Sequence, residues 1–273
     1  MIAFDLPLRF ALWLAAAAAT MLPWSACAST NDVADIFARA NDAYERGDFA
    51  SAAAGYARCV ELGADGADVL YNLGNARARS GQMGHALAAY WAARRVAPRD
   101  PDLLANVEQL TAMRANAAPE VPRSWLMAAA GGLVRRLTVN ELVGTALLAL
   151  VALTVAGVLL ILREGPQHRL WVVFGVLALV TLVMGAAAWA KWDHDYRHPP
   201  AFVTGDQAGM RSGPGMHFEV TGHLQAGTQV EPVRRSGMWT EIRLTTGKRA
   251  WVEESSLARL PQPGASGTRP EAE

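Results

Sequence analysis

Residues 142–162 read LVGTALLALVALTVAGVLLIL, and residues 170–190 read LWVVFGVLALVTLVMGAAAWA. Neither stretch contains a charge, and as a helix rising 1.5 Å per residue each would reach about 31 Å, the thickness of a bilayer's hydrocarbon core. The loop between them, 163–169, has Gly-Pro at its middle, which is typical of a tight turn. The pattern predicts a two-helix transmembrane hairpin. The alternative is a buried hairpin of a soluble protein, which two adjacent uncharged stretches of this length disfavour.

The composition of the whole chain agrees with a membrane protein. Of 273 residues, 52% are hydrophobic and 18% are charged, whereas soluble domains carry about 25% charged residues. The formal net charge is +0. Because no basic excess is available to hold phosphates, we expect no nucleic-acid partner.

The first 28 residues are typical of a secretory signal peptide. An apolar run, Phe10–Leu22, ends at Pro23 and is followed by the small-x-small site Ala26-Cys27-Ala28. The alternative is a lipoprotein in which Cys27 is acylated. Cleavage would leave Cys59 as the single cysteine, which can form neither an internal disulfide nor a zinc site. We expect Cys59 to be a buried small hydrophobe, with a redox-sensing thiol as the alternative.

The predicted topology follows from counting the spans. A cleaved signal leaves the N-terminus outside, and two spans return the C-terminus outside, with the loop 163–169 in the cytoplasm. The aromatic residues Trp189, Trp192 and Tyr196 would flank the outer membrane boundary. We therefore expect a multi-pass protein of the bacterial inner (cytoplasmic) membrane with both flanking modules in the periplasm. Charge adds little to this orientation, because Arg135 and Arg136 flank the first span on the supposed outer side.

An internal repeat with an offset of 34 residues lies before the hairpin. The offset pairs Gly47 with Gly81 and Tyr56 with Tyr90, and it also pairs small residues such as Ala52 and Ala86. Small residues let helices approach closely, and the glycines suit a left-handed turn between helices. In spacing and residue type the segment is similar to the tetratricopeptide repeat (TPR). This resemblance implies an α-helical TPR solenoid in a domain at 29–118, with repeats at 33–66 and 67–100 and a capping helix at 101–114.

The TPR resemblance also implies where a protein partner would bind. Such arrays generally bind through the concave face that the first helix of each pair lines. Mapped onto this chain, that face holds Asn41, Tyr44, Tyr71, Asn75 and Arg79, with Asn72 and Asn106 nearby. Asparagine side chains can hold a peptide backbone or a terminal carboxylate. The alternative is that Asn41 and Asn75 only bridge helices.

Two short segments join the hairpin to its neighbours. Residues 119–141 are predicted as an interfacial helix or a plain linker, and Thr138–Glu141 resembles a capping box that opens the first span. Residues 191–200 are predicted as a solvated stalk, with metal binding by its Asp and His residues as the alternative.

Residues 201–260 are predicted as a small all-β module, followed by a disordered tail at 261–273. Strands are expected at 219–224, 229–233, 239–244 and 249–253, separated by glycines. The Arg211-Ser-Gly-Pro-Gly215 turn, Gly237-x-Trp239 and Trp251-Val252 closely resemble the bacterial SH3 (SH3b) domain, which implies an SH3-like barrel. Arg211 and Trp239 are our candidates for its protein-binding groove. The alternative for Trp239 and Trp251 is the core of the barrel.

The order of modules resembles the BatE-type membrane proteins of the Bacteroides aerotolerance (Bat) group across nearly the whole chain. That resemblance implies a scaffold beside von Willebrand factor A-domain membrane proteins and, indirectly, a MoxR-type AAA+ ATPase, in envelope or oxidative-stress tolerance. We expect no catalytic residues, no metal and no cofactor, because phosphate-binding and hydrolase motifs are absent from the sequence. The function expected is a non-enzymatic scaffold that binds proteins and membrane lipid. The alternatives are a protein that binds or senses peptidoglycan and, with least support, a wall hydrolase.

Overall fold

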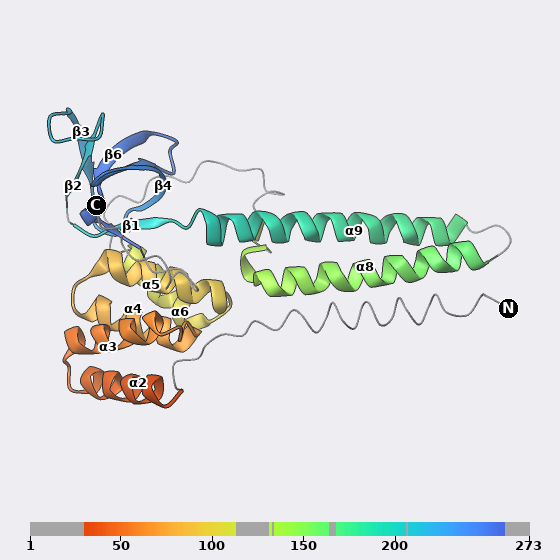
Figure 1. The fold of residues 1–273 in the computed structure, drawn as a ribbon, viewed down its shortest axis with the longest axis horizontal. Helices are drawn as coiled ribbons and strands as arrows, with labels where there is room; N and C mark the ends of the chain where they lie inside the picture. Colours follow the sequence, from red (N-terminus) through yellow and green to blue (C-terminus); the bar gives the residue numbers. More distant parts are fainter. Residues whose placement is uncertain (1–29, 113–130, 133, 164–167, 206, 260–273) are drawn as a thin grey trace, which may run out of the picture.

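The protein consists of a helical region, a long helical hairpin and a β domain, with the first and last lying together at one end of the hairpin (Figure 1). This computed structural model describes residues 30–112, 131–132, 134–163, 168–205 and 207–259. The predicted signal peptide, the segment 113–130 and the predicted tail therefore lie outside the described residues.

The helical region contains two helix pairs followed by a fifth helix. The bounds are α2 Thr30–Glu45, α3 Phe49–Glu61, α4 Ala67–Arg79, α5 Met83–Val96 and α6 Pro101–Ala112. The turns inside the two pairs are equivalent at the offset of 34 residues. Gly47 and Gly81 adopt φ values of 79° and 78°, a left-handed conformation that glycine takes without steric cost. The internal repeat is therefore present in the structure.

Small residues allow the helices of each pair to pack closely. Ala52 and Ala86 are fully buried at equivalent positions of α3 and α5. A Cβ atom at Gly74 would overlap the ring of Tyr90, so α4 can approach α5 only with glycine there. Asp100 accepts hydrogen bonds from the backbone N–H groups of Asp102 and Leu103, both at 3.0 Å, and so starts α6.

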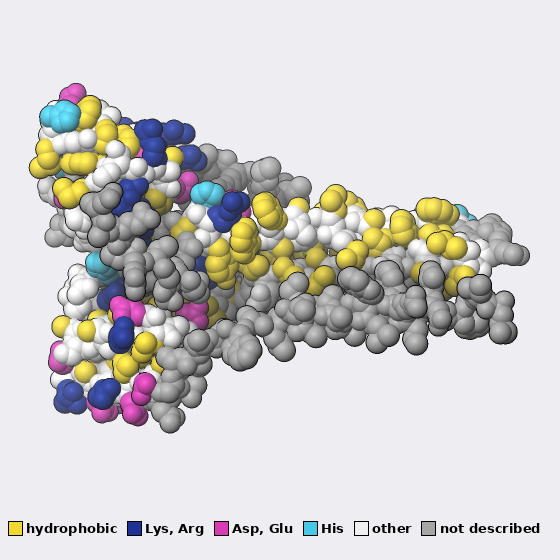
Figure 2. All heavy atoms as spheres, viewed as in Figure 1, with side chains coloured by type: hydrophobic (Ala, Val, Ile, Leu, Met, Phe, Trp, Pro, Cys, Tyr) yellow, Lys and Arg dark blue, Asp and Glu magenta, His cyan; other side chains and the backbone are white. Residues whose placement is uncertain are grey.

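Helices α8 (Val139–Leu162) and α9 (His168–Trp192) form the hairpin. Helix α8 begins three residues before the predicted span, because Thr138 and Glu141 form the expected capping box. Both helices are long and apolar enough to cross a membrane, and only 11% of the most apolar window of α8 and 0% of that of α9 are buried. This exposure contradicts a buried hairpin of a soluble protein, and Figure 2 shows the apolar side chains along its outer surface.

The end of α9 differs from the solvated stalk that we expected. Residues Asp193–Arg197 (η1) continue the helix as one wider π-helical turn. Asp195 in this turn is only 6% exposed. It forms an ion pair with Lys191, with 3.2 Å between Lys191 Nζ and Asp195 Oδ2. The sequence did not reveal this burial, because the cover comes from Arg95 of α5, which donates a 2.7 Å hydrogen bond to the Asp195 carbonyl.

The β domain is a seven-stranded antiparallel sheet in the order β3-β2-β6-β5-β4-β1-β7. Its strands are β1 Ala201–Val203, β2 Ala208–Arg211, β3 Val220–Leu224, β4 Gln229–Ser236, β5 Trp239–Arg243, β6 Arg249–Glu253 and β7 Leu257–Ala258, with a short 3-10 turn, η2 Glu254–Ser256, before the last. The four predicted strands are present, and β4 is longer than expected. The pattern missed β1, β2 and β7, which are two to four residues long.

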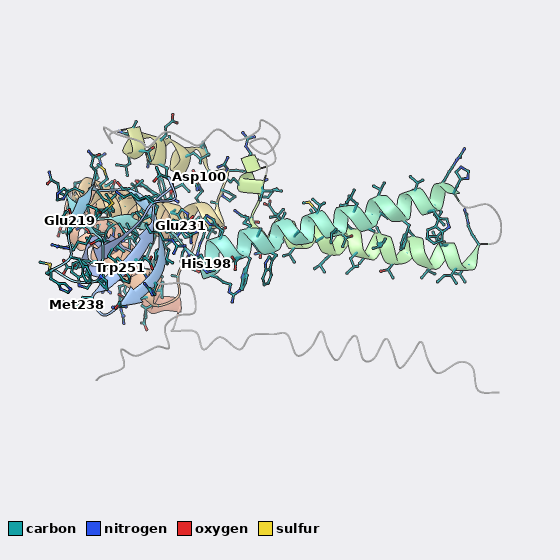
Figure 3. All side chains as sticks on the ribbon, turned by 90° about the horizontal axis from the view of Figure 1, so that it is seen from above. Asp100, His198, Glu219, Glu231, Met238 and Trp251 are labelled. Atoms are coloured by element: carbon teal, nitrogen blue, oxygen red, sulfur yellow. The ribbon has the colours of Figure 1, made fainter. Side chains whose placement is uncertain are left out.

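The β domain packs directly on the helical region. Phe202 of β1 and Ala258 of β7 form one buried cluster with Leu87 and Ala88 of α5. The β domain also has a separate hydrophobic core of its own, which includes Val203, Val230, Ile242, Ala250 and Val252. The helical region and the β domain are therefore joined into one body (Figures 1 and 3). This body lies at the end of the hairpin where α8 begins and α9 ends, which we call the foot of the hairpin.

Candidate functional site

The first candidate site is a polar network on the helical region. The hydroxyl of Tyr56 on α3 donates a 2.6 Å hydrogen bond to Asn41 Oδ1 on α2. One repeat later, the hydroxyl of Tyr90 on α5 donates a bond of the same length to Asn75 Oδ1 on α4. Both asparagines thus bridge the two helices of a pair, as one of our two interpretations expects.

Asn106 of α6 extends the second pair into a network. Its Nδ2 group donates at 3.0 Å both to Asn75 Oδ1 and to the hydroxyl of Tyr71. Burial raises the pKa of Tyr90, and Tyr71 raises it further, so the hydroxyl that donates to Asn75 stays protonated. Asn75, Asn106 and Tyr90 therefore satisfy one another's polar groups inside the protein, which supports a structural role for these three residues.

Tyr44 and Arg79 extend the same surface outside the network. The ring of Tyr44 meets the edge of the Phe49 ring, with centroids 5.2 Å apart. The exposed guanidinium of Arg79 lies over Phe49 at 6.0 Å. Asn72 is half-buried and does not take part in the network. Of these three residues Arg79 is exposed and Tyr44 and Asn72 are half-buried, and binding of a partner through them stays a prediction.

Cys59 lies behind this surface in the core between α2 and α3. Its side chain is fully buried, and burial raises the pKa of its thiol. A buried, protonated thiol reacts slowly with oxidants, because the thiolate is the reactive form. The structure therefore agrees with the expected small hydrophobe.

The second candidate site is the turn after β2 in the β domain. Arg211 Nη1 donates two hydrogen bonds of 2.8 Å, one to the carbonyl of Met216 and one to that of Phe218. A Cβ atom at Gly213 would overlap the ring of Phe218. The glycines of the predicted turn are thus needed for close packing, and Arg211 holds the turn closed.

The two tryptophans of the β domain differ in exposure. Trp251 of β6 is 7% exposed, with the guanidinium of Arg234 over its ring at 5.1 Å. Trp239 of β5 is half-buried, with Arg211 over its ring at 5.6 Å. Residue Met238, next to Trp239, lies at the end of the β domain away from the hairpin (Figure 3) and is 71% exposed. The structure thus brings Arg211 and Trp239 together and buries Trp251, and a binding groove at the first two residues stays a prediction.

Sequence reasoning missed the contact between the helical region and the β domain. Gly84 and Ala88 are buried on α5, whereas the equivalent Ala50 and Ala54 on α3 are exposed. The pattern offered a weak signal, because Gly84 lies in the first turn of α5, where the turn between helices does not need a second glycine after Gly81. Among the described residues no group of His, Cys, Asp and Glu is arranged to hold a metal ion.

Comparison with known proteins identifies the class of the β domain. Residues 206–258 match the family described as the bacterial SH3 domain. This chain is also similar to a protein of Bacillus subtilis (strain 168) named "Putative N-acetylmuramoyl-L-alanine amidase YrvJ", with 26% identity over 68 residues. That similarity covers 25% of this chain and 13% of the amidase, so it bears on the SH3 region and not on catalysis.

Proposed function

We propose that this chain is a non-enzymatic, membrane-anchored binding protein whose SH3 domain binds peptidoglycan. The match of residues 206–258 to the bacterial SH3 family carries the proposal. The similarity to a protein named as an amidase of N-acetylmuramoyl-L-alanine supports the wall as the ligand. The half-buried Trp239 beside Arg211 offers an aromatic and cationic surface of the kind that holds a sugar or a peptide carboxylate.

The helical region would bind a protein partner as a TPR-like domain. This part of the proposal rests on the two equivalent helix pairs and on the exposed guanidinium of Arg79. In the scaffold interpretation the partners are von Willebrand factor A-domain membrane proteins and, indirectly, a MoxR-type AAA+ ATPase. That choice of partners and the role in stress tolerance rest on the resemblance to BatE-type proteins.

The contact between α5 and the β domain supports a joint role for the two modules. Because Phe202 and Ala258 bury themselves against Leu87 and Ala88, a wall ligand and a protein partner would be held at a fixed mutual orientation. The start of α8 and the end of α9 both lie beside the body formed by the helical region and the β domain. Both modules would therefore lie on one side of the bacterial inner membrane. We propose that this side is the periplasm, with the loop 163–169 in the cytoplasm.

Sedimentation with purified cell walls tests the wall ligand. Full-length protein in mild detergent should sediment with wall material, and Trp239→Ala should lose most of this binding. Arg58→Ala on α3 is the control, because Arg58 is exposed and remote from the β domain. Failure of the wild type to sediment would reject the wall ligand and favour the protein scaffold. Clearing of the wall suspension by the purified protein would reject the non-enzymatic assignment.

Reporter fusions test the orientation. A reporter that works only in the periplasm should be active when fused after Ala112 and after Arg259, and inactive when fused after Gln167. The reverse pattern would place both modules in the cytoplasm and reject the wall ligand on independent grounds.

A further inference from the structure

Several arginines lie at the foot of the hairpin, on the side of the membrane that the predicted topology places outside. The usual preference for positive charge on the cytoplasmic side does not account for them. Three elements meet there: helix α5, the short helical segment at 134–136 that precedes Thr138, and the end of α9 (Figure 1). Trp189 and Trp192 of α9 are 62% and 39% exposed, which is typical of the boundary between hydrocarbon and headgroups. Charged groups at the same foot therefore lie at the level of lipid headgroups.

Three carboxylates at this end of the hairpin are paired with cations. Glu141 pairs with Arg99, Asp195 pairs with Lys191 at 3.2 Å, and Asp193 pairs with Arg197 at 3.6 Å. Four further cations lack a carboxylate within ion-pair distance among the described residues. We call them the foot cluster: Arg94, Arg95, Arg135 and Arg136.

The four members of the foot cluster belong to two elements that meet at the foot. Arg95 is fixed between two rings, with its guanidinium 5.0 Å from the Trp91 centroid and 4.5 Å from that of Tyr196. Its Nε group is buried and finds no hydrogen-bond acceptor in the described part of the chain. An unsatisfied buried donor is costly, so this edge of Arg95 favours an added acceptor.

Arg94 and Arg135 lie near enough for their like charges to interact. Burial lowers the pKa of Arg94, Asp195 opposes this shift, and Arg135 lowers the pKa further. Arg135 and the neighbouring Arg136 are exposed. A bound anion would relieve this repulsion, and guanidinium groups suit phosphate because they donate in a planar fork.

We propose that the foot cluster binds the headgroup of an anionic phospholipid. The first turns of α8 supply the path for the acyl chains, because Val143 and Leu147 are exposed and apolar. A continuous apolar surface below a cationic cluster fits a lipid and not a free phosphate ion. The site would hold the body formed by α5 and the β domain against the membrane surface. This inference rests on the proposed membrane placement of the hairpin.

Quenching of tryptophan fluorescence by brominated lipids tests the site. Full-length protein is reconstituted in phosphatidylcholine vesicles that contain either brominated phosphatidylglycerol or brominated phosphatidylcholine at equal fractions. Lipids bound at the foot lie beside Trp189 and Trp192 and quench them. We expect the wild type to prefer the anionic lipid by about 25-fold, since each of the two exposed arginines, Arg135 and Arg136, contributes a factor of roughly five.

The variant Arg94→Gln/Arg135→Gln/Arg136→Gln should reduce this preference to below about twofold. Arg95 is left intact because it packs between two rings. The control Arg39→Gln/Arg46→Gln/Arg58→Gln removes three exposed arginines of α2, α3 and the turn between them, and it should keep the preference. Quenching by both lipids without preference in the wild type, or a preference that survives in the foot variant, would overturn the site alone. An absence of quenching by either lipid would overturn the membrane placement and the site with it.

Discussion

The backbone of Gly84 in α5 lies directly against the carbonyl of Val203 in β1, and a Cβ atom at position 84 would overlap that oxygen. Gly84 is the second residue of α5, so the missing side chain lets the start of this helix approach the backbone of β1. The relationship joins two modules that the sequence places on opposite sides of the hairpin.

Replacing this glycine should destabilise the full chain. In Gly84→Ala overpacking against backbone atoms costs about 1–3 kcal/mol, and the gain in helix propensity stays below the roughly 1 kcal/mol of a helix interior, because Gly84 lies in the first turn of α5. We expect a lower midpoint of thermal unfolding, measured in detergent. Gly144→Ala is the control, because Gly144 lies within α8 and a Cβ atom there would meet no other atom within 4 Å. A midpoint at or above that of the wild type would show that α5 and β1 do not pack in this way.

The two equivalent asparagines should differ in their effect on stability. Asn75 Oδ1 accepts hydrogen bonds from both Tyr90 and Asn106, whereas the recorded side-chain bond of Asn41 is the one from Tyr56. Truncation leaves the donors unsatisfied at about 1–3 kcal/mol for each buried group. Asn75→Ala should therefore lower the unfolding midpoint more than Asn41→Ala, as calorimetry would measure. Equal effects would argue against the role assigned to Asn106.

Substitutions of Arg211 and Trp239 should differ in how much they affect the unfolding midpoint relative to wall binding. Because Arg211 holds two carbonyls of its turn, Arg211→Gln should lower both the unfolding midpoint and wall binding, with a loss of stability of about 1–3 kcal/mol. Trp239 is only half-buried. Trp239→Ala should therefore lower wall binding while changing the unfolding midpoint less than Arg211→Gln does. Loss of stability in Trp239→Ala as large as in Arg211→Gln would assign both residues to the barrel core.

His85 should make stability depend on pH. Burial lowers the pKa of its imidazole from 6.5, and the nearby Arg77 lowers it further. The unfolded chain therefore binds a proton before the folded protein does, so stability is complete above about pH 6.5 and is lost as the pH falls below that value. Unfolding midpoints between pH 7.5 and pH 5.5 should fall less for His85→Gln than for the wild type. His223→Gln, at an exposed position of β3, should keep the wild-type slope.

The sequence by itself predicted the features that local patterns specify. Two uncharged stretches predicted α8 and α9, because burying a charge in hydrocarbon is costly. The 34-residue offset predicted equivalent helix pairs, since Tyr56 and Tyr90 fill equivalent spaces. The Arg211–Gly215 turn, together with Gly237-x-Trp239 and Trp251-Val252, predicted the bacterial SH3 domain, and a Cβ atom at Gly213 of this turn would overlap the Phe218 ring.

The tertiary structure decided how these parts meet. Strands β1 and β7 are too short to show a period of two, and they exist because α5 covers one face of them and β4 extends the sheet. The burial of Asp195 and the assembly of the foot cluster likewise depend on segments that are distant in the sequence. Local patterns record which side chains must leave water, whereas the partner that covers each one is fixed only when distant segments pack together.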